Sequence, residues 1–367
     1  MYNGITIMLS GDVMTGRGID QILPHPSDPT LFESYIKDAR DYVKLAERVN
    51  GAIDGPVGFD YIWGDLLGPM KAADLRIINL ETSITTSDAH LDKGINYRMH
   101  PKNIPCLLSG QIDCCVIANN HILDWGHEGL LETLESLEKT GMAHSGAGHD
   151  IERARAPARL KTNEKGKVLV FTYGLASSGI PNEWQATKDR PGINLINGLS
   201  RATINQIGAE ITQSKKTGDI VIASIHWGGN WGYDVPQNHI DFAHDLIDLA
   251  GVDIVHGHSS HHPLGIEVYH SKPILYGCGD LLNDYEGISG HETYRANLGF
   301  LYFITVDISE GHLVFLEMAP TEVKKFQLVH PNEKDRKWLQ QLLDREGERF
   351  GTRTAWKGNG LLSLIWD

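Results

Sequence analysis

The 367-residue sequence contains few cysteines, no long hydrophobic run and less positive than negative charge. Its four cysteines, Cys106, Cys114, Cys115 and Cys278, have neither the CxxC spacing of a metal or redox motif nor the density of a disulfide-stabilised domain. We therefore expect four reduced thiols, with Cys114 and Cys115 buried in the apolar run IDCCVIA and none of the four acting as a metal ligand.

The lack of a long hydrophobic run and the excess of negative charge limit where the protein is expected in the cell and which partners it is expected to bind. No stretch of about 18 apolar residues is present, and residues 1–9 lack the features of a signal peptide. The sequence thus predicts a cytoplasmic protein without stable membrane insertion. Lys and Arg number 33 against 47 Asp and Glu, a formal net charge of −14. This charge repels a polyphosphate backbone, so nucleic acid is not an expected partner, and the oligomeric state stays open.

Short apolar, β-branched runs along the chain predict buried strands. They cover residues 5–9, 75–80, 168–173, 220–225, 273–276, 300–306 and 313–318. Apolar residues at helical spacing around 130–137 and 243–250 lie between some of these runs, and strands that alternate with helices indicate an α/β fold. The last three runs have little helix between them, which predicts antiparallel pairing and mixed sheets.

One large domain is expected over residues 1–325, with an insertion around 23–69. The insertion holds several Pro and Gly residues around a predicted helix at 33–50, and such a segment can shape a substrate cleft. Residues 326–367 are expected to form a C-terminal helical extension packed on this domain, because the charged segment 333–349 carries an apolar stripe.

Polar residues that can bind metals follow five predicted strands: those at 5–9, 75–80 and 220–225, and two shorter apolar runs, IDCCVIA (112–118) and DIV (253–255). The segments are SGDVMTGR (10–17), NLETS (79–83), NNHILDWG (119–126), HWGGNWG (226–232) and HGHSSHHP (256–263). The carboxyl ends of strands are where α/β folds bind ligands. Carboxylates combined with neutral imidazoles suit manganese, iron or zinc, which such sites hold as a pair about 3.5 to 4 Å apart. The five strand ends together predict one site for two divalent metal ions.

These motifs, with PILYGCGD at 273–280, resemble the ordered motifs of the CapA, or poly-gamma-glutamate capsule biosynthesis, family over residues 5–284. That family is similar in fold to the metallophosphoesterases, or calcineurin-like proteins. The resemblance therefore implies an α/β sandwich of two mixed β-sheets flanked by helices. It also implies six metal ligands, with Glu81 as the bridging carboxylate: Asp12, Glu81, Asn120, His226, His258 and His261.

Three further residues have roles beside the metals if the resemblance holds. His121 would protonate a leaving group or orient the substrate. Asp124 would hold that imidazole in one tautomer, or it would cap the helix that begins near Gly126. Arg17 would clamp a phosphate or carboxylate, or it would form a structural salt bridge.

The chain also departs from the family pattern at the metal site. Met14 stands where metallophosphoesterases carry an imidazole ligand, so one ion position loses a ligand. The family's GHHPH reads GHSSH at 257–261, and Asn230 and Asp280 stand where the family has a glutamate and an asparagine.

The leading hypothesis is a metal-dependent hydrolase with a dinuclear metal-activated water. Its substrate would be an anionic polymer, peptide or phosphoester of capsule or cell-envelope metabolism. One alternative is a non-hydrolytic peptide epimerase that uses His121 or His261 as the base. Another is a non-catalytic capsule-assembly accessory that binds acidic polymer.

Overall fold

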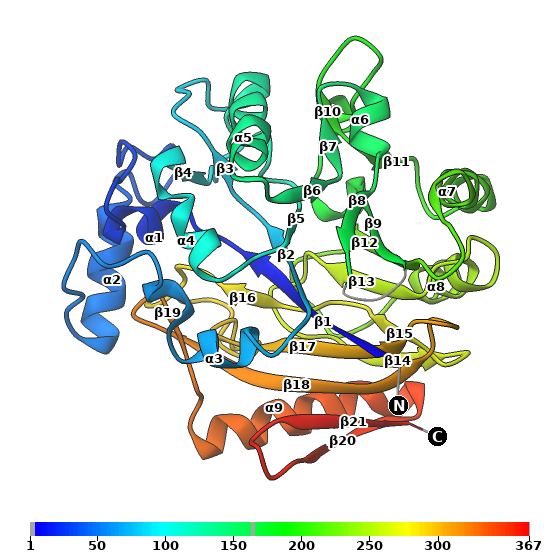
Figure 1. Ribbon diagram of the computed structural model, residues 1–367. Coiled ribbons are helices and arrows are strands. Elements are labelled where there is room, and N and C mark those ends of the chain that lie inside the picture. Colours follow the sequence, from blue (N-terminus) through cyan, green and yellow to red (C-terminus); the bar gives the residue numbers. More distant parts are fainter. Residues whose placement is uncertain (1–3, 163–165, 367) are drawn as a thin grey trace.

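Two large β-sheets pack against each other in the computed structural model, which describes residues 4–162 and 166–366 (Figure 1). Within these residues the first sheet has ten strands. Its order is β20 (Thr352–Trp356), β21 (Leu362–Trp366), β18 (Leu313–Lys324), β17 (Leu298–Asp307), β1 (Gly4–Val13), β2 (Leu75–Leu80), β5 (Cys114–Val116) and β6 (Ala143–Ser145), with β16 (Asp280–Leu282) beside β1 and β19 (Gln327–Val329) beside β18. Strands β1, β2, β5 and β6 are parallel, whereas β17 and β18 are antiparallel neighbours.

The second sheet has seven strands in the described part of the chain. Its order is β11 (Leu195–Ile196), β9 (Lys167–Leu175), β12 (Ile220–His226), β13 (Ile254–His258), β15 (Lys272–Leu275) and β14 (Ile266–Tyr269), with β8 (Ala158–Lys161) beside β9. Strands β9, β12, β13 and β15 are parallel, and β8 and β14 are antiparallel to their partners. The expectation of two mixed sheets is therefore confirmed.

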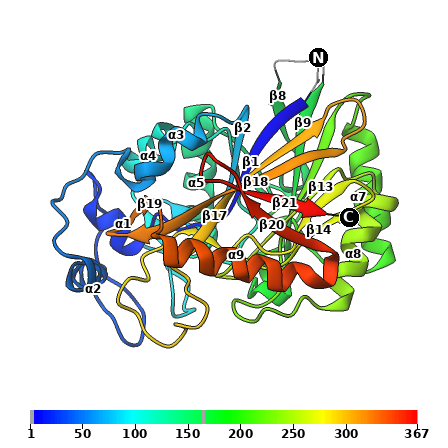
Figure 2. The ribbon, with the colours of Figure 1, turned by 90° about the horizontal axis from the view of Figure 1, so that it is seen from below.

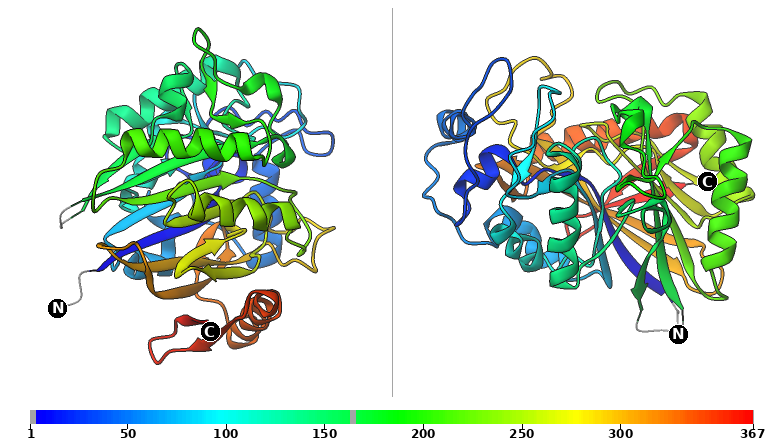
Figure 3. Two further views of the ribbon diagram at one scale, coloured as in Figure 1. Left: turned by 90° about the vertical axis from the view of Figure 1, so that its right-hand side faces the viewer. Right: turned by 90° about the horizontal axis from the view of Figure 1, so that it is seen from above.

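Helices cover the outer face of each sheet (Figure 3). On the first sheet they are α1 (Arg17–Ile22), α2 (Arg40–Asn50), α3 (Leu67–Met70), α4 (Pro105–Ser109) and α5 (Gly126–Thr140), and on the second α7 (Arg201–Ser214) and α8 (Gln237–Asp248). Strand β1 explains this layering, because Ile7 and Leu9 point into the core between the sheets and Met8 points toward the helices. A strand buried on both faces is the pattern of a sheet covered on both sides.

Smaller elements complete the fold. Strands β3 (Ser83–Ile84) and β4 (Arg98–Met99) form one short pair, and β7 (Ala147–Gly148) and β10 (Gly192–Ile193) another, with α6 (Ile151–Arg155) after β7. No helix among the described residues combines the length and hydrophobicity needed to cross a bilayer. The four cysteines are free and buried, as expected.

Two segments differ in detail from their predictions. The helix expected over 33–50 begins only at Arg40, because the carboxylate of Asp38 accepts the Arg40 backbone N–H and residues 30 and 38 pair as an isolated bridge. The helix expected over 333–349 is present as α9 (Glu333–Gly347). After it, β20 and β21 add to the first sheet next to β18, a pairing that we did not predict (Figure 2).

Candidate metal centre

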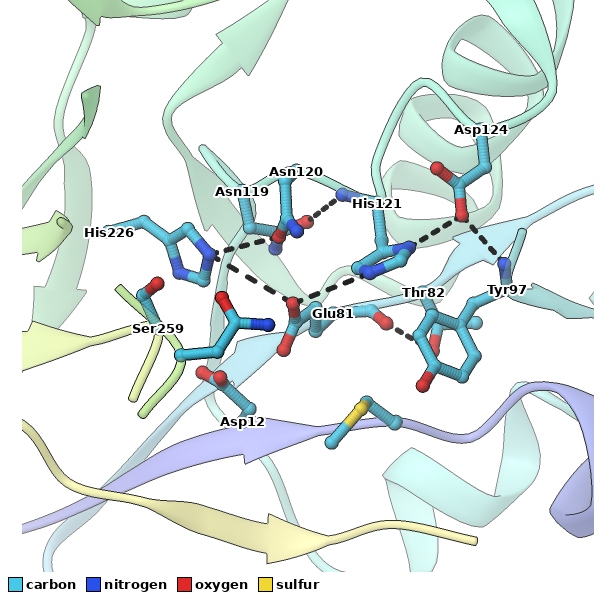
Figure 4. A network of polar contacts seen from close by, with 12 residues as sticks. Asp12, Glu81, Thr82, Tyr97, Asn119, Asn120, His121, Asp124, His226 and Ser259 are labelled. Carbon is cyan, nitrogen blue, oxygen red and sulfur yellow. Dashed lines mark hydrogen bonds and ion pairs between the residues drawn. The ribbon is translucent and has the colours of Figure 1, made fainter. Parts of the chain in front are cut away.

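Strand ends from both sheets bring the expected metal ligands together (Figure 4). Asp12 lies in β1, and Glu81 directly follows β2 in the same sheet. His226 and His258 are the last residues of β12 and β13 in the other sheet. In Figure 4 a dashed line joins the imidazole of His226 to the carboxylate of Glu81, and Asp12 lies below these two side chains.

Strand register sets the position of Asp12. It lies opposite Asp280 where β1 runs parallel to β16. The two strands can approach this closely because residue 11 is glycine, since a Cβ atom on Gly11 would lie 1.7 Å from the carbonyl oxygen of Gly279. The carboxylates of Asp12 and Asp280 are thereby held side by side in the interior.

Two buried groups of side chains have the geometry of metal-ligand sets. Asp12, His226 and His258 form the first, and Asp12, His261 and Asp280 form the second. Within each group the ligand atoms lie within 4.8 Å of one another. Asp12 belongs to both groups, so the two sets are adjacent.

Asp280 was not among the residues that we expected to bind metal. The available signal was that position 280 carries a carboxylate where the family has an amide, in a chain that has also lost an imidazole at Met14. Sequence alone did not connect the two changes, because only the β1–β16 pairing brings residue 280 beside Asp12.

The first group is built from rings in direct contact. His226 lies opposite His258 in the register of β12 and β13, and their Nδ1 atoms are 2.7 Å apart. His226 Nε2 lies 3.0 Å from Asn120 Oδ1 and 3.9 Å from Glu81 Oε1. Burial lowers the pKa of both imidazoles, so they are neutral and retain a lone pair for a metal. Ser259 has a φ of 107°, a strained conformation of the kind that clusters at functional sites.

The carboxylates of Asp12 and Glu81 are incompletely hydrogen-bonded. Asp12 Oδ2 and Glu81 Oε2 are buried without a hydrogen-bond partner among the described residues. Burial raises the pKa of Asp12, and so does the neighbouring Asp280 carboxylate. Burial likewise raises the pKa of Glu81, and the charge of Asp12 adds to the effect. Buried carboxylates without partners are costly, and a bound divalent cation would remove that cost, so this donor set fits a metal pair.

The second ligand group includes the positions at which this chain differs from the family pattern: Asp280 and Asn230 contact His261, and Met14 lies where metallophosphoesterases have an imidazole. His261 Nδ1 lies 2.9 Å from Asp280 Oδ1, and Asn230 Nδ2 lies 3.0 Å from His261 Nε2. Burial alone would lower the pKa of His261, but the Asp280 carboxylate outweighs it and raises that pKa. The sulfur atom of Met14 accepts a hydrogen bond from the Tyr285 hydroxyl, with 3.5 Å between sulfur and oxygen.

A chain of hydrogen bonds orients His258. His256 Nε2 lies 2.9 Å from the Ser10 carbonyl oxygen, which can only accept, so this nitrogen carries the proton. Burial lowers the pKa of His256 to about 4, so its Nδ1 is an acceptor for the Ser224 hydroxyl at 3.1 Å. Ser224 Oγ then accepts from His258 Nε2 at 2.9 Å. The lone pair of His258 is left on Nδ1, which faces His226.

Replacing Ser224 with alanine should weaken metal binding without removing a ligand. Loss of the hydroxyl frees the tautomer of His258, and partners of this kind are typically worth about 10- to 100-fold in metal affinity. Titration with manganese would measure the change. Ser109→Ala on α4, which removes a hydroxyl that donates to the carbonyl oxygens of residues 59 and 106, should leave the affinity unchanged. Equal affinity in both variants would contradict the tautomer argument.

His121 and Asp124 form a hydrogen-bonded pair beside the first group (Figure 4). His121 Nδ1 lies 2.7 Å from Asp124 Oδ2, and its Nε2 lies 3.8 Å from Glu81 Oε1. Asp124 also accepts from Lys93 Nζ at 2.7 Å and from the Tyr97 backbone N–H at 2.6 Å. Helix α5 has no side-chain cap, so the geometry favours the tautomer-holding interpretation of Asp124 over capping.

Arg17 is engaged in structural ion pairs. Its Nη1 donates to Glu33 at 2.9 Å and to the Tyr42 hydroxyl at 3.0 Å, and its Nε donates to Asp284 at 3.1 Å. A second bond joins its Nη2 to Asp284. The guanidinium is buried, and this geometry favours the salt-bridge alternative for Arg17 over a substrate clamp.

The helix-flanked sandwich of two mixed sheets, with carboxylate, amide and imidazole groups at its central strand ends, is a metallophosphoesterase-like fold. A solved structure described as a novel phosphatase from Mycoplasma pneumoniae has the same fold, with a TM-score of 0.51 over 92% of this chain and 98% of that one at 12% identity. The model of the family "Bacterial capsule synthesis protein PGA_cap" matches residues 6–285, and the chain belongs to that family.

Named relatives agree with this assignment. The chain is 46% identical to a "Probable polyglutamine synthesis accessory protein" of Mycobacterium tuberculosis, over 98% of this chain and 96% of the relative. It is 27% identical to the "PGA biosynthesis protein CapA" of Bacillus subtilis over 70% of this chain and 64% of that protein. With the "Capsule biosynthesis protein CapA" of Bacillus anthracis the identity is 23% over 76% and 60%.

Proposed function

We propose that this protein is a metal-dependent hydrolase that uses a pair of divalent ions and acts on an anionic polymer, peptide or phosphoester of capsule or cell-envelope metabolism. The observation that supports the proposal most strongly is the pair of buried ligand groups that share Asp12. Manganese, iron or zinc suits this mixture of carboxylates and neutral imidazoles.

In this proposal every expected ligand has a position. Asn120, His226 and His258 would hold one ion, and His261 with Asp280 would hold the other. Asp12 contributes to both groups, and Glu81, whose pKa responds to both Asp12 and Asp280, would bridge them. Ions in such a pair lower the pKa of a water molecule and polarise the bond that is cleaved.

His121 would move the proton in the reaction. Burial lowers its pKa to about 4, so the ring is neutral at pH 7 and, with Nδ1–H donated to Asp124, its lone pair is on Nε2. That nitrogen faces Glu81 and can take a proton and return it to the leaving atom. Asp124 stabilises the protonated ring in between, and Lys93 keeps Asp124 in place.

An activity screen tests the proposal. The purified protein would be assayed on phosphoesters, glutamyl peptides and cell-wall peptides, with manganese, zinc and iron added separately. We expect turnover on at least one substrate, dependent on the added metal and lost with a chelator. A fully loaded protein without turnover on any substrate would contradict hydrolysis and favour an accessory that binds polymer. Exchange of solvent deuterium into a peptide without cleavage would favour an epimerase.

Removal of the metals should destabilise the fold. A ligand present at a thousand times its dissociation constant stabilises the native state by about 4 kcal/mol, and chelation would remove that stabilisation. Repulsion between the carboxylates of Asp12 and Asp280 would then lower the stability of the fold further. Thermal unfolding with a chelator should therefore occur at least several degrees lower than with manganese. Identical midpoints would contradict metal binding by the folded chain.

A further inference from the structure

Two tyrosine hydroxyls lie in the wall of a cleft beside the metal groups. The cleft has a volume of about 860 Å³, and Tyr97, Tyr285 and His261 are among its lining residues. Residues of the insertion, including part of α2, form another part of its wall. The ring of Tyr97 meets the His121 imidazole edge-on, with 4.4 Å between ring centroids (Figure 4). The ring of Tyr285 meets the His261 imidazole in the same way at 5.6 Å. The two tyrosines therefore extend from the proposed proton-transfer group to the second ligand group.

The hydrogen bonds of the two hydroxyls run in one direction. Tyr285 Oη donates to the Met14 sulfur at 3.5 Å, because a thioether can only accept. Its single proton is thereby used, so the bond of 3.1 Å between the two hydroxyls is donated by Tyr97. Within the described residues, neither hydroxyl makes a further hydrogen bond. The series of donors therefore ends on the sulfur of Met14.

This last acceptor is a poor one. A thioether sulfur is a weak acceptor, whereas hydrogen bonds to ionised oxygens are about twice as strong as those between neutral groups. A charged oxygen that enters the cleft beside Tyr285 would therefore replace Met14 as the acceptor with a net gain. A tyrosine hydroxyl keeps its proton at pH 7, so it remains a donor to such an oxygen.

The segment after β16 holds Tyr285 in place. The Tyr285 backbone N–H donates to Asn283 Oδ1 at 3.1 Å, and Asn283 Nδ2 donates to Asp280 Oδ2 at 2.9 Å. The residue before Tyr285, Asp284, is fixed by its buried ion pair with Arg17. Arg17 is thus a positioning residue, and Tyr285 is tied to a proposed metal ligand. A donor that is held in place before the substrate binds needs little reorganisation during the reaction.

We propose that Tyr285, supported by Tyr97, is an oxyanion donor of the metal centre. Its hydroxyl turns from Met14 to a charged oxygen of the group that is hydrolysed, and its proton stays on Tyr285 throughout. A phosphoryl group and the tetrahedral adduct of an amide both present such an oxygen. The inference rests on the proposed function, because the oxygen must belong to a group bound beside the two ligand groups.

Calorimetric titration with two stable oxyanions tests the proposal without turnover. Inorganic phosphate represents a phosphoryl group, and a phosphinic dipeptide represents the tetrahedral adduct of a peptide bond. The manganese-loaded full chain and its Tyr285→Phe variant, which keeps the ring but lacks the hydroxyl, would be titrated at pH 7. We expect the variant to bind at least one of the two oxyanions about tenfold or more weakly, with unchanged metal content, because it loses a hydrogen bond to a charged group.

Two further variants and a kinetic measurement make the result specific. Tyr97→Phe removes only the donor behind Tyr285 and should weaken the same oxyanion about two- to fourfold. Tyr173→Phe is the matched control, because that hydroxyl bonds Glu210 of α7 at 3.4 Å on the helix-covered face of the second sheet, and its affinities should be unchanged. On any accepted substrate, Tyr285→Phe should lower kcat roughly 100-fold and raise KM less, because the donor acts on charge that develops in the transition state.

The outcomes separate this proposal from the hydrolase proposal. A loss of affinity for phosphate alone assigns the donor to phosphoryl groups, and a loss for the phosphinic dipeptide alone assigns it to peptides. Equal affinities of the parent and Tyr285→Phe for both oxyanions, or binding of neither by the parent, would overturn the oxyanion role even if a substrate is cleaved. Weaker oxyanion binding by Tyr285→Phe without turnover on any substrate would uphold that role and count against hydrolysis.

Discussion

Asp12→Asn should abolish binding of both metal ions, which is the largest effect expected from any single replacement in this chain. Asp12 lies in both ligand groups, and its Oδ1 already accepts a hydrogen bond from Asn79 Nδ2 at 2.7 Å. An asparagine amide would therefore place its own nitrogen either against this donor or against the cations. We expect the metal content to fall from about two ions per chain to well below one, with affinity reduced at least about 100-fold.

Two further variants make the result specific. Asp280 belongs to the second group alone, so the Asp280→Asn variant should lose one ion and keep the other. Asp113→Asn alters a carboxylate that pairs with Arg76 away from the site and should bind both ions normally. Metal analysis of the dialysed proteins measures all three. Retention of two ions by Asp12→Asn, or equal losses in Asp12→Asn and Asp280→Asn, would contradict a shared ligand.

His121→Ala should reduce turnover by roughly two to four orders of magnitude, the range typical of a positioned acid or base, with metal content unchanged. The imidazole is fixed by Asp124, its Nε2 lies 3.8 Å from Glu81 Oε1, and it belongs to neither ligand group. The measurement is a single-turnover rate on any accepted substrate, together with metal analysis of the same sample.

Glu81→Ala is the matched comparison for His121→Ala. Removing the carboxylate that interacts with both Asp12 and Asp280 should lower the metal content as well as the rate. Full activity in His121→Ala would contradict its role in proton transfer, and loss of metal in that variant would make it a ligand. The comparison therefore distinguishes the group that moves a proton from the group that holds the ions.

Much of the fold was predictable because the central strands are buried on both faces. Continuous apolar runs marked β2 at its observed bounds, Leu75–Leu80, and β12 within one residue, at Ile220–His226. Strands β20 and β21 were missed, because their alternating and partly exposed residues give a weaker sequence signal. Their buried residues are covered through the pairing of β21 with β18 and the packing of β20 against α9.

The site was predictable where each ligand directly follows a buried strand. Asp12, Glu81, His226 and His258 lie at or directly after the ends of such strands, and the structure brings them together. Asp280 was missed because its proximity to Asp12 depends on the β1–β16 register. The role of Arg17 was left open because its ion pairs join it to residues 33 and 284, which are distant in sequence. Such long-range pairings cannot be deduced from spacing along the chain.

Anomalous X-ray diffraction from crystals grown with manganese tests the central claim most directly, because it places the ions without requiring a substrate. The account predicts two peaks about 3.5 to 4 Å apart, one beside His226 and His258 and the other beside His261 and Asp280, with Asp12 contacting both. The absence of any peak at Asp12 in crystals that show manganese bound elsewhere would contradict it.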